Sequence, residues 1–304
     1  MQQRLFFHNH HILASYQQII MQHTHIDAPQ RLAASSLAAW AQSLRQTSPA
    51  LFWGGLALLL MSCFTLLLTQ MDARLFQGVS VWLKPWKFQF STGVYLLTLL
   101  LFMLWLPGPA LQTRSARYVV WVGLLSGLFE VAYITWQGAQ GKASHFNTAT
   151  SFDSVMYTLM GVGAVLLVSV SAVLSVVIAR SKTYVLPPAL KLSIVLGLGM
   201  TFVLGMVFGG YMSGQPTGHW VGAAPTDAGG LPLVAWSRSG GDLRVAHFFG
   251  IHAMHFIPLF AFVLHRLGTP QKLALDAVWS FAALFCVLTT WTFFQALHGQ
   301  PFWA

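Results

Sequence analysis

The sequence predicts an all-α fold, a polytopic helical bundle that crosses a membrane several times. Hydrophobic residues make up 56% of the 304 residues, charged residues make up 8%, and the mean hydropathy is +0.63. A soluble domain carries about 25% charged residues, so a chain this poor in charge cannot cover itself with polar surface. Apolar runs of about 20 residues, the length that spans a bilayer, recur along the chain.

We expect seven transmembrane helices, because seven apolar runs are separated by turn-forming segments such as LPGPA and LGTPQK. The expected spans are residues 50–70, 88–106, 118–138, 153–179, 187–212, 243–265 and 273–296. This pattern divides the chain into a polar N-terminal segment, residues 1–48, and a transmembrane helical domain, residues 49–304.

The N-terminal segment contains one amphipathic stretch. In QRLAASSLAAWAQSL, the residues Leu32, Leu37, Trp40 and Leu44 fall near one helical face. This spacing is typical of a short helix lying on the membrane surface, and an ordinary linker helix explains it equally well. The segment lacks the pattern of a cleavable secretory signal. Met21 is an alternative start of translation.

The distribution of Lys and Arg predicts the orientation. With the N-terminus inside, ten of these residues fall in cytoplasmic segments and six in outer segments, which favours an N-in, C-out topology. The net charge of +9 then fits loops that face the anionic cytoplasmic leaflet, and it does not indicate binding to nucleic acid. We expect a multi-pass protein of the bacterial inner membrane.

Histidines gather toward the predicted outer ends of the helices. His247, His252 and His255 lie in the sixth span, and His145 lies in the outer loop before the fourth. His252 and His255 are three residues apart, so they share a helix face and can bind one metal ion. The alternative is a set of histidines that hydrogen-bond to neighbouring helices. We favour a metal site built from these four residues.

Two acidic residues are candidate catalytic groups. Glu130 lies inside the third span, where a carboxylate is costly unless it is neutral or paired. It is a candidate proton carrier, metal ligand or partner of a ligating histidine. Its own partner is expected to be a histidine of the sixth span, Lys84 or Lys87. Asp153 begins the fourth span, where it or Ser151 also fits a helix cap.

Basic and amide groups on the same side complete the candidate site. In VWLKPWKFQFS, Lys84 and Lys87 flank Pro85, an arrangement that fits residues at the membrane interface. It also fits a corner that binds a carboxylate, a phosphate or a haem propionate. Asn147 and Arg244 join these lysines as candidate cofactor-binding residues. Asp242 is expected to cap the sixth span.

The stretches KPWKF, SHFN…FD and GGDLRVAHFFGIHA together resemble a family of uncharacterised bacterial multi-pass integral membrane proteins. The resemblance covers most of the chain from the first span onward. It implies that these three stretches form one outward-facing site, and it implies no activity or cofactor.

These observations favour a membrane protein whose outward-facing site binds a transition metal (Fe, Cu or Zn) or haem b and takes part in redox chemistry. The partner would be a small molecule or an electron-transfer protein on the outer face, and a homo- or hetero-oligomer is compatible with the sequence. A membrane-embedded zinc hydrolase, with His145, His252 and His255 as ligands, is one alternative. A proton-coupled transporter or a small subunit of a membrane complex is another.

Overall fold

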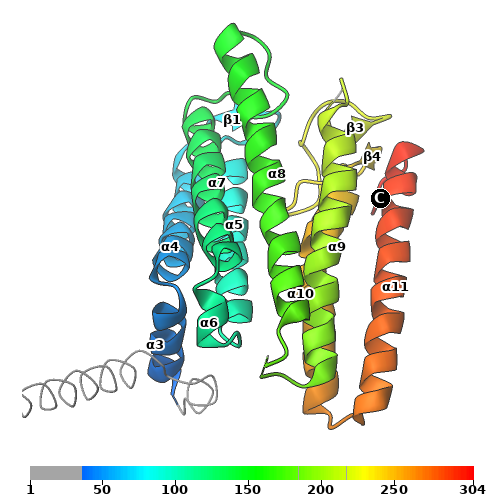
Figure 1. The fold of residues 1–304 in the computed structure, drawn as a ribbon. Helices are drawn as coiled ribbons and strands as arrows, with labels where there is room; N and C mark the ends of the chain where they lie inside the picture. Colours follow the sequence, from blue (N-terminus) through cyan, green and yellow to red (C-terminus); the bar gives the residue numbers. More distant parts are fainter. Residues whose placement is uncertain (1–35, 184, 217) are drawn as a thin grey trace, which may run out of the picture.

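The computed structural model describes residues 36–183, 185–216 and 218–304, and most of them are helical. Seven long helices run roughly side by side (Figure 1). They are α4 (Pro49–Met71), α5 (Leu83–Met103), α7 (Arg114–Ala139), α8 (Ser151–Arg180), α9 (Pro188–Ser213), α10 (Arg244–Arg266) and α11 (Gln271–Leu297). Two shorter helices, α3 (Leu37–Thr47) and α6 (Gly108–Leu111), lie at one end of the bundle.

Six of the described helices are long and apolar enough to cross a membrane, namely α4, α7, α8, α9, α10 and α11. The chain therefore has the character of a multi-pass membrane protein. Helix α5 has 21 residues but is not among these six. It begins at Leu83, five residues before the expected span, and its first turns carry Lys84, Lys87 and Gln89, which lower its hydropathy. The count of seven spans, like the orientation, stays a prediction.

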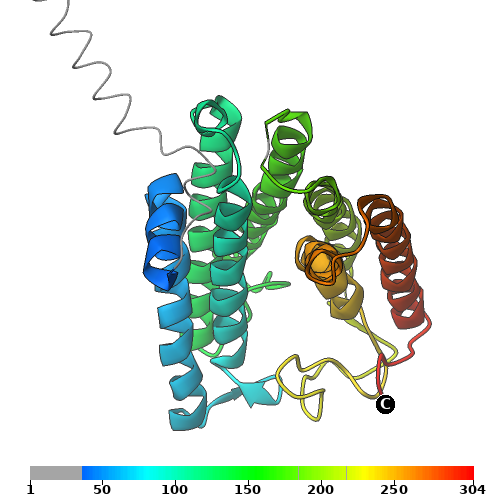
Figure 2. The same ribbon diagram turned by 90° about the horizontal axis from the view of Figure 1, so that it is seen from below.

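The long helices form two groups joined by α8. Helices α4, α5 and α7 pack against one another, and so do α9, α10 and α11. Helix α8 packs against α7 on one side and α9 on the other. Loop segments connect the two groups at one end (Figure 2), and within the bundle His255 of α10 lies 3.2 Å from the Thr98 hydroxyl of α5. The largest cluster of buried side chains centres on the first group and includes Leu96, Val119 and Leu174.

That end of the bundle, here called the loop end, carries the longer connections. Residues 72–82, 140–150 and 214–243 and the C-terminal tail all lie there, as the alternation of helix directions predicts (Figure 1). Two short antiparallel pairs order these loops. Strand β1 (Leu75–Phe76) pairs with β2 (Val79–Ser80), and β3 (Trp220–Val221) pairs with β4 (Gly241–Asp242).

The caps of two helices differ in detail from the sequence prediction. The N-cap of α8 is Thr150, whose hydroxyl accepts a hydrogen bond from the Asp153 amide at 3.1 Å and donates to the Asp153 carboxylate at 2.7 Å. Thr150 thus takes the N-cap place expected for Ser151 or Asp153, and its hydroxyl bonds both to the amide and to the carboxylate of Asp153. The N-cap of α10 is Leu243, while the Asp242 carboxylate accepts from the Arg244 amide at 3.0 Å.

The predicted interfacial helix is only partly covered by the described residues. Helix α3 begins after the N-cap Ser36, so Leu32 lies outside the described part of the chain. The side chain of Leu37 is 90% exposed, whereas Leu44 packs against the largest buried cluster. A helix is therefore present where the sequence predicts one, and its contact with a membrane surface stays a prediction.

Candidate functional site

A pocket of ≈ 620 Å³ opens at the loop end. One wall comes from the β1–β2 hairpin, the start of α5 and loop 140–150. The other wall comes from the end of α9 and the long loop 214–243, together with Leu297 of α11. The pocket thus lies between the two helix groups, and its size is in the range that holds a small-molecule ligand.

Lys84 and His145 meet inside this pocket. The Lys84 ammonium nitrogen lies 3.2 Å from Nδ1 of His145, and the Ser144 hydroxyl lies 3.1 Å from the same nitrogen. Burial, followed by the positive charge of Lys84 and the presence of His247, lowers the pKa of His145 well below its usual range. His145 is therefore neutral near pH 7, and its Nδ1 accepts the proton that Lys84 donates.

Lys87, one turn further along α5, lines the same pocket and anchors the long loop. Its ammonium group donates a hydrogen bond to the Val234 carbonyl at 3.0 Å. Among the described residues, no carboxylate lies within 4.0 Å of the Lys84 or Lys87 nitrogen. Two lysines thus face a pocket without the anionic partners that semi-buried cations ordinarily have. Burial accordingly lowers the pKa of Lys84 to about 7 and that of Lys87 to about 8.

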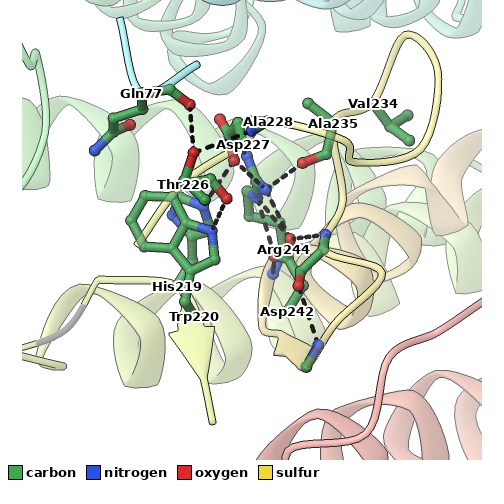
Figure 3. Close-up of polar contacts among 12 residues, drawn as sticks. Gln77, His219, Trp220, Thr226, Asp227, Ala228, Val234, Ala235, Asp242 and Arg244 are labelled. Atoms are coloured by element: carbon green, nitrogen blue, oxygen red, sulfur yellow. Dashed lines mark hydrogen bonds and ion pairs between the residues drawn. The ribbon is translucent and has the colours of Figure 1, made fainter. Parts of the chain in front are cut away.

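Arg244 forms ion pairs with two acidic residues of this region, Asp227 and Asp242. Its guanidinium binds Asp242 at 2.7 and 2.9 Å and Asp227 in a two-point pair at 2.8 and 3.3 Å (Figure 3). It also donates to the Ala235 carbonyl at 2.6 Å. Asp242, whose side chain is fully buried, accepts a further hydrogen bond from the Ser237 amide at 2.9 Å. The predicted cofactor-binding residue Arg244 is therefore occupied in holding loop 214–243 on α10.

His219 borders the same network. Its Nε2 lies 3.6 Å from an Asp227 oxygen, and its ring lies against the Trp220 ring with centroids 3.7 Å apart. Burial lowers the pKa of His219, and the neighbouring Asp227 only partly opposes this effect. For Asp227, burial acts to raise the pKa, but the contact with His219 and the charge of Arg244 together lower it. Asp227 is therefore an ionised partner of Arg244.

Among the described residues, four other than glycine adopt left-handed backbone angles, and all four lie in the loops of this end. Gln77 and Phe146, with φ of 51° and 55°, line the pocket. Leu233 and Ala235, with φ of 65° and 56°, flank the carbonyl that Lys87 binds. Such angles are uncommon and carry a free-energy cost, and they gather at sites where loop geometry serves binding.

The three histidines of α10 lie outside the pocket lining. The His252 and His255 Nδ1 atoms lie 3.1 Å apart, which confirms that the two rings share a helix face. His255 Nε2 lies 3.2 Å from the Thr98 hydroxyl, which itself donates to the Val94 carbonyl at 2.8 Å. His255 therefore donates to Thr98 and accepts from His252. This directed chain of hydrogen bonds links α10 to α5.

His247 is placed apart from this pair. Its ring lies against Gly209 of α9, where a Cβ atom would come within 2.9 Å of it. Among the described residues, its Nδ1 has no hydrogen-bond partner. No hydrogen bond joins His145 to any histidine of α10 in the described part of the chain.

The predicted acidic residues occupy the α7–α8 interface. Glu130 is 4% exposed and faces Gly163 of α8, and its Oε1 has no hydrogen-bond partner among the described residues. The partners expected for it, Lys84, Lys87 or a histidine, form no ion pair with it there. Asp153 accepts hydrogen bonds from Thr150 and from Gln137, at 2.7 and 3.2 Å.

Asn147 shapes loop 140–150. Its amide nitrogen donates to the Ala143 carbonyl at 3.1 Å, and its oxygen accepts from the Ala149 amide at 3.1 Å. These contacts fold the loop back on itself and so present His145 to the pocket. Asn147 itself does not line the pocket.

The predicted four-histidine metal site is not assembled in the described residues. Within residues 36–183, 185–216 and 218–304, no three His, Cys, Asp or Glu side chains are grouped so that they could hold a metal ion. The same applies to the ligand set expected for a zinc hydrolase. Binding of a metal or haem therefore stays a prediction, and it draws no support from this geometry.

Sequence reasoning missed several residues that the fold brings to the pocket or its rim. Asp227, His219, Trp220 and Ser144 belong to it, and only their position in loops at the outer end could have indicated this. Thr98, the partner of His255, carries no sequence signal because threonine is common in transmembrane helices.

No protein-family model, no curated protein and no solved structure matches this chain. Function is therefore inferred from the chemistry of the site residues.

Proposed function

We propose that this membrane protein binds a small anionic molecule in the pocket at its loop end. One observation carries the proposal: Lys84 and Lys87 both line the pocket, and neither has a carboxylate partner within 4.0 Å among the described residues. A bound anion would supply the missing negative charge.

The distribution of contacts supports an anion over a cation as the ligand. Asp227 is the acidic residue in the pocket lining, and Arg244 neutralises it through a two-point ion pair. Lys84 is hydrogen-bonded to a neutral imidazole and Lys87 to a carbonyl. An ammonium group has three N–H donors, so both lysines retain donors for a ligand. Hydrogen bonds between such groups and an anion are stronger than those between neutral partners.

The rest of the lining indicates that the anion carries an apolar part. Phe76, Phe146, Tyr211 and Trp220 contribute aromatic surface, and Ile134 contributes aliphatic surface. The lysines and His145 form a polar corner within this apolar wall. A few polar groups in a largely apolar pocket are typical of sites that orient a small ligand by its charged end. An aromatic or aliphatic carboxylate fits this chemistry.

The test is calorimetric titration of the detergent-purified protein with benzoate, inorganic phosphate and the neutral analogue benzamide. We expect benzoate to bind more tightly than benzamide, because only benzoate carries the charge that the lysines complement. Lys84→Met and Lys87→Met should each weaken benzoate binding by about 10- to 100-fold, the effect of losing one hydrogen bond to a charged group.

Lys272→Met is the matched control, because Lys272 is exposed at the opposite end of the bundle. It should leave the affinity unchanged. Equal binding of benzoate and benzamide, or unchanged benzoate affinity in both pocket variants, would contradict the proposal. Tighter binding of phosphate than benzoate would keep the anion site but remove the apolar part of the ligand assignment.

A further inference from the structure

We infer that Glu130 is a proton-binding site within the membrane domain and that it holds its proton as a neutral acid at the α7–α8 interface. This inference concerns the α7–α8 interface and does not depend on an anion occupying the pocket.

The position of Glu130 favours the neutral acid. It lies nine residues before the end of α7, so it is about 14 Å from the loop end of that helix. Its side chain is 4% exposed, and Oε1 has no hydrogen-bond partner among the described residues. An unpaired carboxylate in such surroundings costs several kcal/mol, whereas a protonated carboxyl group is tolerated.

The neighbouring helix makes room for this carboxyl group. A Cβ atom built on Gly163 of α8 would lie 2.7 Å from Glu130 Oε1, so the carboxyl oxygen fills the space that a side chain would otherwise take. The interface is thus shaped around an acid at position 130. No described residue offers a paired cation there, which distinguishes this acid from Asp227 and Asp242.

A separate set of hydrogen-bonded groups lies on the loop-end side of Glu130. The exposed Thr150 hydroxyl donates to Asp153 at 2.7 Å, and the Gln137 amide donates both to Asp153 at 3.2 Å and to the Tyr133 hydroxyl at 2.7 Å. Glu130 Oε1 has no hydrogen bond to any of these groups. The carboxyl group is therefore separate from this network.

Few other ionisable groups surround this site. On α7 and α8 the ionisable groups toward the loop end are Tyr133, Asp153 and Tyr157. The Tyr157 hydroxyl donates to the Ser213 carbonyl of α9. On α5, packed against α7, Lys84 and Lys87 face the pocket. Lys84 also acts on Glu130 through its charge, without forming an ion pair with it. Glu130 is also the only glutamate among the seven acidic residues of the chain, which simplifies its detection.

The test is infrared spectroscopy of the full-length protein in detergent at neutral pH. A protonated carboxylic acid gives a carbonyl band that shifts on deuteration. We expect such a band in the wild type, its loss in Glu130→Gln and a shift in its frequency in Glu130→Asp. Asp276→Asn, which changes an exposed acid at the opposite end, should keep the wild-type band.

A wild type without the band, or a band that persists in Glu130→Gln, would overturn the proton site. Neither result bears on anion binding, which is measured separately.

Discussion

The ammonium nitrogen of Lys84 lies 3.2 Å from Nδ1 of His145, and this contact ties the first turn of α5 to loop 140–150. The two residues are 61 positions apart in the chain. The contact is a hydrogen bond from a cation to a neutral imidazole, because burial and the charge of Lys84 hold the pKa of His145 low. Burial lowers the pKa of Lys84 itself to about 7, because no carboxylate within 4.0 Å among the described residues compensates its charge.

The first prediction concerns the pH dependence of anion binding. An ordinary histidine, with a pKa of about 6.5, would become a cation as the pH falls from 8 to 6 and would strengthen anion binding. The pKa of His145 is lowered, so this residue should contribute nothing, but burial lowers the pKa of Lys84 to about 7 and that of Lys87 to about 8. Both lysines gain charge as the pH falls, so we expect benzoate affinity to rise from pH 8 to pH 6, and His145→Gln to show the same rise. A rise in affinity centred near pH 6.5 that His145→Gln abolishes would contradict this expectation.

The second prediction concerns Arg244. Replacing it with Met would leave Asp227 and Asp242 without their cation, and Asp242 is fully buried. Removing one partner of a buried ion pair costs about 3–5 kcal/mol. We expect a lower thermal unfolding midpoint and faster proteolysis within residues 214–243. Arg244→Lys should recover only part of the loss, because an ammonium group cannot make the same two-point contacts. Wild-type proteolysis in Arg244→Met would show that the loop is held by other contacts.

The third prediction concerns the stability of the long loop in acid. The pKa of His219 is lower in the folded protein than in the unfolded chain, so the unfolded chain binds more protons once the pH falls below about 6.5. Stability is therefore complete above that pH and is lost as the pH falls toward the folded-state pKa. Amide hydrogen exchange of residues 218–227, corrected for the intrinsic pH effect, should become faster at pH 5.5 than at pH 7.5.

His219→Gln should reduce this difference, because glutamine does not titrate. His298→Gln, which changes an exposed histidine at the same end, serves as the control and should keep the difference. If both variants behave alike, His219 is not the group that responds to acid.

The fourth prediction compares two glycines of α8. Gly163→Ala would place a methyl group 2.7 Å from Glu130 Oε1, so the carboxyl group must move or the helices must separate. Such crowding costs about 1–3 kcal/mol. Gly161 has no atom within 4 Å of the corresponding position, so Gly161→Ala should leave stability unchanged or raise it by at most about 1 kcal/mol. Equal thermal midpoints of the two variants would show that the interface is not fitted closely to Glu130.

Most of the helices were predictable from composition, because each is apolar along its length, at its exposed positions as well as its buried ones. Helix α5 was the exception, since its first turn carries Lys84 and Lys87 and apolarity alone places its start too late. Local cap chemistry was also nearly predictable. Thr150, next to the expected Ser151, takes the cap because the chain is extended there, with φ of −130° and ψ of 163°.

The candidate site was predictable only in its residue types. Lys84, His145 and Lys87 do meet at one end of the bundle, as the topology implies. The partner of each group depends on contacts between distant segments, which periodicity does not encode. Arg244 meets Asp227, 17 residues away, because the long loop folds back over α10. The α10 histidines reach α5 and α9 instead of loop 140–150, so helical spacing predicted their shared face but not their neighbours.

The position of the pocket has a mechanical consequence. Its walls belong to both helix groups, with Lys84 and Lys87 on one and Tyr211 and Leu297 on the other. A ligand seated there contacts both helix groups and holds them together at the loop end. Binding and separation of the groups are then reciprocal, so whatever spreads the helices loosens the ligand by the same free energy with which the ligand resists spreading. A force that separates the two helix groups would therefore lower the fraction of pockets that hold a ligand.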